Sequence, residues 1–258
     1  MSARHTDPDP ALTEGGAEVS GHLPDGPAGV PAPAPSRTAR GRRASRDALV
    51  AQRLQDAALS LPGAPTAVFD FDKTLTVRDT FLPWLTVLRG RPRTLAAGLA
   101  SLRSGLTGVS SGGSARGATK VAMARRLLTG VPVSDAQAAA RRLVAGITWS
   151  APVCARLHEH LRRGDAVLIA SGSFRLAVAA MVAERFGADA AMQVIGTELE
   201  EDGGRLTGRL SGPNCIGAAK AERVRDWLAQ SGQPGGWGYG NAPWDLPMLA
   251  LMQHRTVV

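Results

Sequence analysis

Two carboxylates directly after an apolar segment have the residue types and spacing for phosphoryl transfer. Asp70 and Asp72 follow the run 66–69. A carboxylate can act as a nucleophile that divides hydrolysis into two easier steps through an acyl phosphate. A second carboxylate two positions on can protonate the leaving oxygen and later deprotonate water. The pair therefore predicts Asp70 as nucleophile and Asp72 as general acid and base.

Other polar groups follow two further apolar segments. Ser171 comes after the run 166–170, and Asn241 to Asp245 follow residues 237–240. Lys220 lies near the start of a predicted helix. Hydroxyl and ammonium groups stabilise phosphate oxygens, and Mg²⁺ takes oxygen ligands that bridge carboxylates to phosphate. We therefore expect phosphate contacts from Ser171 and Lys220, with Mg²⁺ as cofactor.

The elements that would position these groups alternate along the chain. Apolar runs predict strands at 66–70, 166–170 and 237–240, helices at 174–186, 217–229 and 245–252, and a strand–turn–strand at 193–210. Alternating strands and helices favour an α/β fold with a doubly wound parallel sheet. In such sheets ligands bind outside the carboxyl ends of the strands, so separate segments can converge on one crevice.

A helical block is predicted between the first two strands. Its candidate helices are 80–88, 92–103, 118–129, 134–145 and 151–163, with a Gly/Ser break at 105–117. The block is too long for one crossover, so we expect a cap domain at 78–163 and a core formed by 64–77 and 164–258. Residues 1–47 are rich in Pro and Arg and are expected to be a disordered tail before a helix at 46–59.

Composition and charge narrow the function classes. The chain has 258 residues, 44% of them hydrophobic, and no apolar run long enough to span a membrane. The first 30 residues do not resemble a signal peptide, so we expect a cytoplasmic protein. Residues 78–163 hold fourteen Lys and Arg against three acids. Such a segment attracts anions, either a charged substrate, an acidic membrane surface or nucleic acid.

Several residues are assigned ordinary structural roles. Cys154 and Cys215 are expected to be reduced and buried, and His158 and His160 lie on different helix faces, which argues against a zinc site. The segment 112–120 (GGSARGATK) does not match a phosphate-binding loop. The five tryptophans are expected to pack in the interior: Trp84, Trp149, Trp227, Trp237 and Trp244.

Four motifs in order resemble the haloacid dehalogenase superfamily, in the branch (subfamily IB) that includes phosphoserine phosphatase. DFDKTLT at 70–76 matches the DxDxT signature, and SGS at 171–173 matches the second motif. Cys215-x-Gly217-x-x-Lys220 matches the third, and Gly240-Asn241-x-x-x-Asp245 matches the fourth with one change. The resemblance covers residues 64–258. It implies a Rossmann-like core with an inserted helical cap, and a Mg²⁺-dependent phosphatase that uses a phospho-aspartate intermediate.

The resemblance also implies roles for particular residues. Asp70 would be the nucleophile and a metal ligand, and Asp72 the acid and base with its carbonyl at the metal. Thr74 would support the loop. Ser171, Gly172 and Lys220 would bind phosphate. Asn241 would complete the implied metal site, and Asp245 would support the metal or Lys220. Asp79 stands where phosphoserine phosphatases recognise the substrate amine.

Asn241 departs from the family pattern, which usually has an aspartate at that position. An amide oxygen can ligate Mg²⁺, but it is neutral, so we expect weaker metal affinity. A catalytically weak protein that only binds its ligand is therefore an alternative function. Nucleic acid is not the expected partner of the enzyme, whereas in the binding-only alternative the Arg-rich tail and the cap would bind nucleic acid or lipid.

The substrate is left open among three classes of phosphomonoester. Phosphoserine is favoured by the branch and by Asp79. A phosphatidylglycerophosphate-type lipid is favoured by the apolar segments 81–88 and 94–102, whose neighbouring arginines suit an acidic membrane surface. A sugar or cyclitol phosphate is the third class.

Overall fold

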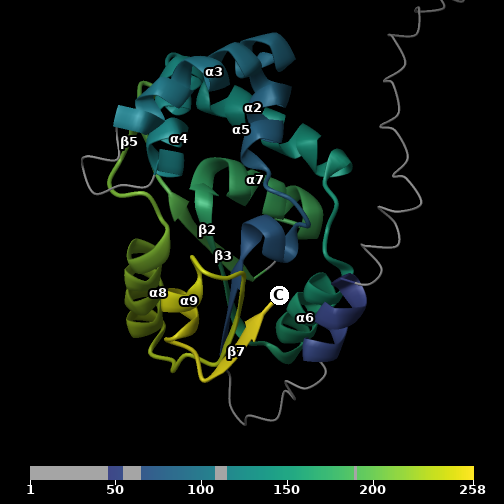
Figure 1. The fold of residues 1–258 in the computed structure, drawn as a ribbon. Coiled ribbons are helices and arrows are strands. Elements are labelled where there is room, and N and C mark those ends of the chain that lie inside the picture. The colour runs from purple at the N-terminus through teal and green to yellow at the C-terminus, as the bar shows by residue number, and fades with distance from the viewer. Residues whose placement is uncertain (1–45, 55–64, 108–114, 189–190) are drawn as a thin grey trace, which may run out of the picture. The chain divides into compact units, whose positions relative to one another are not determined.

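A five-stranded parallel sheet organises the protein (Figure 1). The computed structural model describes residues 46–54, 65–107, 115–188 and 191–258. The strand order is β3-β2-β1-β6-β7, and every neighbouring pair is parallel. The strands are β1 (Thr66–Asp70), β2 (Ala166–Phe174), β3 (Met192–Thr197), β6 (Trp237–Gly240) and β7 (His254–Val257). The predicted α/β fold is confirmed.

Helices cover both faces of the sheet because its strands are apolar on both sides. In β1, Ala67 and Phe69 belong to a buried cluster with residues of α6 (Ala151–Arg163) and α7 (Arg175–Phe186). Val68, which points the opposite way, packs with α8 (Gly217–Ser231) and α9 (Leu246–Leu249). Figure 1 shows α8 and α9 on one side and α6 on the other. The sheet is therefore doubly wound, as predicted.

The strand order changes direction at β1. The chain runs outward from β1 to β2 and β3, and then crosses back to β6 and β7 on the other side of β1. The carboxyl ends of β1 and β6 are thus neighbours at a topological switch point, which is where open α/β sheets bind ligands. Asp70 ends β1 and Asn241 follows β6.

Four helices lie beyond the carboxyl ends of the strands, in the upper part of Figure 1. They are α2 (Phe81–Arg89), α3 (Arg91–Thr107), α4 (Ala115–Leu128) and α5 (Val133–Leu143). The chain enters and leaves this group through two adjacent segments. Val77 N donates to Thr148 O at 2.8 Å, and Ser150 N donates to Leu75 O at 2.8 Å. α6 then contacts β2, so the predicted helical block 78–163 is divided between these four helices and the side of the sheet.

A separate antiparallel hairpin joins the core to α4. It consists of β4 (Leu199–Asp202) and β5 (Arg205–Leu210), with the predicted turn between them. Gly208 has a φ of 77°, and a Cβ there would lie 2.9 Å from Arg125 Cα. Glycine at this position therefore allows the hairpin to lie directly on the α4 backbone. 

Some elements differ from the sequence prediction. β7 was not predicted, α3 and α4 extend into the predicted Gly/Ser break, and α9 is shorter than expected. Trp244 is 52% exposed, which corrects its predicted packing role, whereas Trp84 and Trp237 are buried. The helix predicted at 46–59 is observed over 46–54. The predicted tail at 1–47 lies almost entirely outside the described residues. No helix among the described residues has the length and apolar character of a membrane span.

Candidate active site

Asp70 is held at the end of β1 by the turn that follows it. The next five residues form η1 (Phe71–Leu75), a single wide turn in which Lys73 adopts a φ of 66°. This turn brings Thr74 back over the strand end, where its Oγ1 donates to Asp70 Oδ2 at 2.8 Å. Asp70 is only 4% exposed, so its carboxylate depends on such donors for the hydration it has lost.

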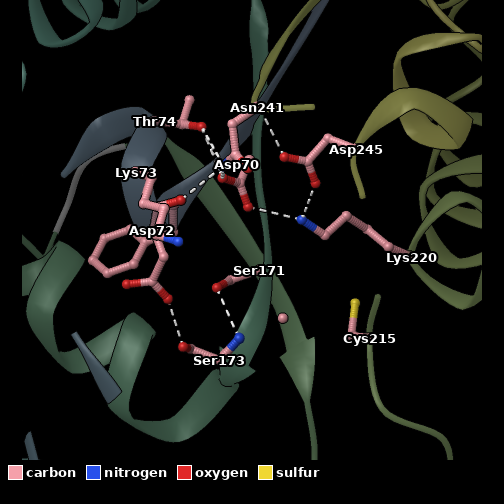
Figure 2. A network of polar contacts seen from close by, with 12 residues as sticks. Asp70, Asp72, Lys73, Thr74, Ser171, Ser173, Cys215, Lys220, Asn241 and Asp245 are labelled. Carbon is pink, nitrogen blue, oxygen red and sulfur yellow. Dashed lines mark hydrogen bonds and ion pairs between the residues drawn. The ribbon is translucent and has the colours of Figure 1, made fainter. Parts of the chain in front are cut away.

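Lys220 joins two buried carboxylates. Its Nζ lies 2.7 Å from Asp70 Oδ1 and 2.6 Å from Asp245 Oδ1 (Figure 2). Burial raises the pKa of Asp70 to about 6, although the Lys220 ammonium opposes this effect. Burial alone would lower the pKa of Lys220, but the two carboxylates outweigh it and raise that pKa above its ordinary value. The lysine is therefore a permanent cation beside Asp70.

Asn241 lies where oxygen atoms from two segments converge. Its Nδ2 is 2.9 Å from Asp70 Oδ2, 2.9 Å from the carbonyl oxygen of Asp72 and 3.3 Å from Thr74 Oγ1. Its backbone N donates to Asp245 Oδ2 at 2.9 Å. Both oxygens of Asp245 are thus engaged, by Lys220 and by Asn241, so this carboxylate orients its neighbours rather than facing the convergence point.

This convergence point fits a magnesium ion in its donor chemistry. Asp70 Oδ2 and the Asp72 carbonyl are oxygen ligands of the kind Mg²⁺ prefers, and a half-turn of the Asn241 amide would add Oδ1 as a third. With one carboxylate in the set, the site has little negative charge. Within the described residues, no group of three His, Cys, Asp or Glu side chains is arranged to hold a metal.

The side chain of Asp72 points away from that convergence point, toward the cavity. Its Oδ1 accepts hydrogen bonds from Thr80 N at 2.7 Å and Thr80 Oγ1 at 2.8 Å, and its Oδ2 accepts one from Ser173 Oγ at 2.5 Å. Burial raises the pKa of Asp72, and the nearby charge of Asp79 adds to this effect. A carboxyl with a raised pKa and a fixed orientation suits proton donation near neutral pH.

The predicted phosphate-binding loop is tightly folded. Ser171 is fully buried, and its Oγ accepts a hydrogen bond from Ser173 N at 3.0 Å. A Cβ on Gly172 would lie 2.8 Å from Ile216 Cγ2, so only glycine fits here without a shift. Gly172 faces the cavity, whereas Ser171 is not among the residues that line it. Ser171 therefore shapes the loop in this structure.

One cavity of about 560 Å³ gathers most of the predicted site. It lies between the helices beyond the sheet and the strand ends. Seven of the eight predicted site residues line it: Asp70, Asp72, Asp79, Gly172, Lys220, Asn241 and Asp245. Asp79 lies on the exposed side, where its Oδ1 accepts a hydrogen bond from Phe81 N at 3.0 Å and caps the start of α2.

Lys120 is a site residue that the sequence did not reveal. It extends from α4 into the cavity, where Nζ donates to the Gly172 carbonyl, to Asn214 Oδ1 at 3.2 Å and to Thr197 Oγ1 at 3.3 Å. It also lies 4.5 Å from the ring centre of Phe174. Burial lowers the pKa of Lys120 to about 8. Lys120 belongs to the segment that fails to match a phosphate loop, and only the tertiary fold places it here.

Three other contributors were also missed: Thr80 and Ser173 as partners of Asp72, and Trp244 as a lining residue. Ser173 was part of a recognised motif, so its position was available as a signal. Thr80 lies beside Asp79, but nothing in the local sequence connects it with Asp72.

The fold and the site define an α/β protein with a buried carboxylate at the switch point of a parallel sheet. The chain belongs to the haloacid dehalogenase-like hydrolase family, whose pattern it matches over residues 67–250. It is 32% identical over 191 residues to Protein CicA of Caulobacter vibrioides, covering 72% of this chain and 82% of that protein. The resemblance to the haloacid dehalogenase superfamily is thus confirmed.

Solved structures share the fold. A protein with unknown function from Bordetella pertussis Tohama I aligns with a TM-score of 0.61 and 23% identity, over 76% of this chain and 90% of that one. A phosphoserine phosphatase carrying a phospho-aspartyl intermediate analogue aligns with a TM-score of 0.51 and 20% identity, over 75% and 85% of the two chains. At these identities the likeness concerns the fold.

Proposed function

We propose that this protein hydrolyses phosphomonoesters through a phospho-aspartate formed on Asp70. The observation that carries the proposal is the pairing of Asp70 with Lys220 at 2.7 Å, in a cavity that also holds Asp72. A buried carboxylate beside a permanent cation can receive a dianionic phosphate that a lone carboxylate would repel. Membership of a hydrolase family supports the same chemistry.

The proposed reaction has two steps. In the first, a carboxylate oxygen of Asp70 attacks phosphorus, and the bond to the leaving oxygen breaks as that oxygen takes a proton from Asp72. In the second, Asp72 removes a proton from water, which attacks the acyl phosphate and releases inorganic phosphate with Asp70 regenerated. Thr80 and Ser173 keep the Asp72 carboxyl directed at the cavity in both steps.

We propose Mg²⁺ as the cofactor, held by Asp70, by the Asp72 carbonyl and by Asn241 through its amide oxygen. Bound there, the ion would offset the negative charge shared by the carboxylate and the phosphate. Lys220 supplies a second positive charge from the protein itself, and Asp245 keeps Lys220 and the Asn241 backbone in position.

We also propose that α2 to α5 act as a cap that covers the cavity and excludes water during the reaction. Phe81 and Lys120, which come from two of these helices, support this role because both line the cavity above the strand ends.

A second candidate function is binding of a phosphate ester without turnover. The position of Asn241 Nδ2 favours it, because this amide already donates to the oxygens that would otherwise hold a metal. In that case the cavity would retain its affinity for phosphate esters through Lys220.

Phosphate release from p-nitrophenyl phosphate, phosphoserine and sugar phosphates, with and without Mg²⁺, tests the proposal. We expect Mg²⁺-dependent turnover that falls at least about a thousandfold in Asp70→Asn, because the nucleophile is lost. Asp226→Asn, an identical change at an exposed position of α8, should keep parental activity. Turnover that survives Asp70→Asn would refute the proposal. Tight binding of these esters without turnover would favour the second function.

A further inference from the structure

The cavity changes character with distance from Asp70. Its base carries the carboxylates and Lys220, but apolar atoms form most of its surface. The apolar side chains come from the start of α2, from α4, and from the segments that precede α8 and α9. They are Phe81, Leu82, Pro83, Met123, Ile216 and Trp244. A phosphate at the base would therefore direct the rest of its ester along an apolar wall.

Two large residues of this wall are unusually exposed. Leu82 is 49% exposed and Trp244 is 52% exposed, and both line the cavity. Leu246, two residues beyond Trp244, is 49% exposed. Leu82 comes from the helices above the sheet and Trp244 from the loop after β6, so the wall has apolar surface on both sides of the cavity. Exposed apolar surface that borders a pocket is typical of ligand binding.

Two charged groups near this wall, Lys120 and Asp79, already have protein partners. Three acceptors surround Lys120 Nζ, which is the number of hydrogen bonds an ammonium can donate. The Asp79 carboxylate accepts a hydrogen bond from Phe81 N. A leaving group with its own carboxylate would have to compete for Lys120, whereas a hydrocarbon would leave its three contacts intact.

We propose that the substrate is a phosphomonoester with an apolar leaving group, an alkyl chain or aromatic ring that lies between Leu82 and Trp244. This inference rests on the proposed phosphatase function and names the substrate class of the same site. Each methylene that the wall buries should raise kcat/KM by up to about fourfold, the factor that corresponds to ~0.8 kcal/mol. The gain ends when the chain reaches beyond Trp244.

A series of ethyl, butyl, hexyl and octyl phosphates, kept below their micelle-forming concentrations, tests the inference. We expect kcat/KM to rise with chain length, and phosphoserine and glycerol 3-phosphate to be hydrolysed at least about tenfold less efficiently than hexyl phosphate. A flat or falling series, or phosphoserine as the best substrate, would overturn it.

Substitutions in the wall test whether a preference for long alkyl chains comes from these apolar side chains. Leu82→Ser and Trp244→Ala should lower kcat/KM for octyl phosphate about tenfold or more and change ethyl phosphate less than about threefold. Leu99→Ser, at a 70% exposed position of α3 that does not line the cavity, is the matched control and should change neither. Equal losses for both esters would contradict the inference.

Binding of the non-hydrolysable ethyl- and octylphosphonate by calorimetry keeps the inference testable if no ester is turned over. Octylphosphonate should bind more tightly, and Trp244→Ala should remove that advantage. Equal affinity of the two phosphonates would overturn the inference that the wall binds an apolar leaving group. Absent turnover alone would overturn only the proposed hydrolysis. Dodecyl phosphate in phosphatidylcholine vesicles then tests whether the substrate is a membrane lipid or a soluble ester. Faster hydrolysis in vesicles than as monomer supports a lipid ester, and slower hydrolysis supports a soluble one.

Discussion

At the level of single residues, Asn241 determines how the site balances its charge. Its amide donates to Asp70 Oδ2 and to the Asp72 carbonyl, so the protein itself supplies partial positive charge where oxygens converge. An aspartate in this position would place a second carboxylate beside Asp70. Such a pair is costly when buried and needs a cation for compensation. We therefore expect the asparagine to lower the need for metal as well as the affinity for it.

Asn241→Asp should tighten Mg²⁺ binding by at least about tenfold, because a coordinating carboxylate brings a full negative charge to the ion where the amide brings none. Calorimetric titration with Mg²⁺ measures the affinity. The same variant should unfold at a lower temperature than the parent without Mg²⁺, since it loses the amide donor and gains a like charge. Gln230→Glu, an exposed amide-to-acid change on α8, is the control. Unchanged Mg²⁺ affinity in Asn241→Asp would contradict the proposed ligand role.

The residues at the base of the cavity could be identified from the sequence because they belong to motifs with a fixed order and spacing. Asp70 ends β1 and Asp245 follows β6; these strand ends converge at one edge of the sheet, and the third family motif adds Lys220 from α8. Contacts made by side chains without a motif could not be identified in this way. Thr80 and Lys120 reach the site through the particular packing of α2 and α4.

At the level of elements, Lys120 connects α4 with the predicted phosphate loop. Its three acceptors all belong to the sheet side of the cavity: the Gly172 carbonyl, Thr197 and Asn214. Thr197 Oγ1 also donates to Gly172 O at 2.9 Å. The carbonyl that fixes the loop is therefore held from β3 and from α4 at once.

Lys120→Met should lower kcat/KM about tenfold or more, because a loop displaced by a fraction of an ångström loses productive contacts. It should also lower the free energy of unfolding by about 1 to 3 kcal/mol, through acceptors left without their donor. Steady-state kinetics and urea unfolding measure the two effects. Arg125→Met removes the same charge from an exposed position of α4 and should be near parental in both. Equal behaviour of the two variants would rule out a positioning role for Lys120.

The elements themselves could be predicted to different degrees, for physical reasons. β1 matched its prediction to the residue because its side chains are buried on both faces and read as one apolar run. β7 has only four residues, one of them buried, and lies at the sheet edge, so its sequence carries little pattern. The beginning of α4 within a Gly/Ser-rich segment is similarly hidden, because its packing on α3 and β5 overrides weak local propensity.

At the level of the whole molecule, a buried polar network lies between α6 and the sheet, apart from the cavity. His160 on α6 contacts Asp165 Oδ2 through Nδ1 at 2.6 Å and the Tyr239 hydroxyl through Nε2 at 2.8 Å. None of these residues lines the cavity. Burial lowers the pKa of His160, although Asp165 opposes this effect. The network therefore links α6, the start of β2 and β6 around a neutral imidazole.

Stability should consequently fall as the pH drops below about 6.5, where a histidine in the unfolded chain takes up a proton. Folded His160 takes up its proton only at lower pH, so the unfolded state binds more protons throughout that window. Urea unfolding at pH 7 and pH 5 measures the loss. In His160→Gln the loss should be smaller, and overall stability should be about 1 to 3 kcal/mol lower.

His158→Gln is the control for this experiment, because His158 is exposed on the same helix. It should keep the parental dependence of stability on pH. An identical pH dependence in His160→Gln and the parent would show that the buried imidazole does not contribute to acid sensitivity.

The adjacent entry and exit of the upper helices have a consequence for how such a protein can diversify. Thr76 and Trp149 form an antiparallel bridge. The two ends of the segment 77–148 are therefore adjacent, like the ends of a short loop. Since closing a loop costs entropy that rises only slowly with length, insertions and deletions there leave the sheet almost undisturbed. Related proteins can thus differ in the helices that contribute Leu82 and Met123. Such a change would alter which leaving group the cavity accepts, while the residues at the strand ends and their chemistry stay the same.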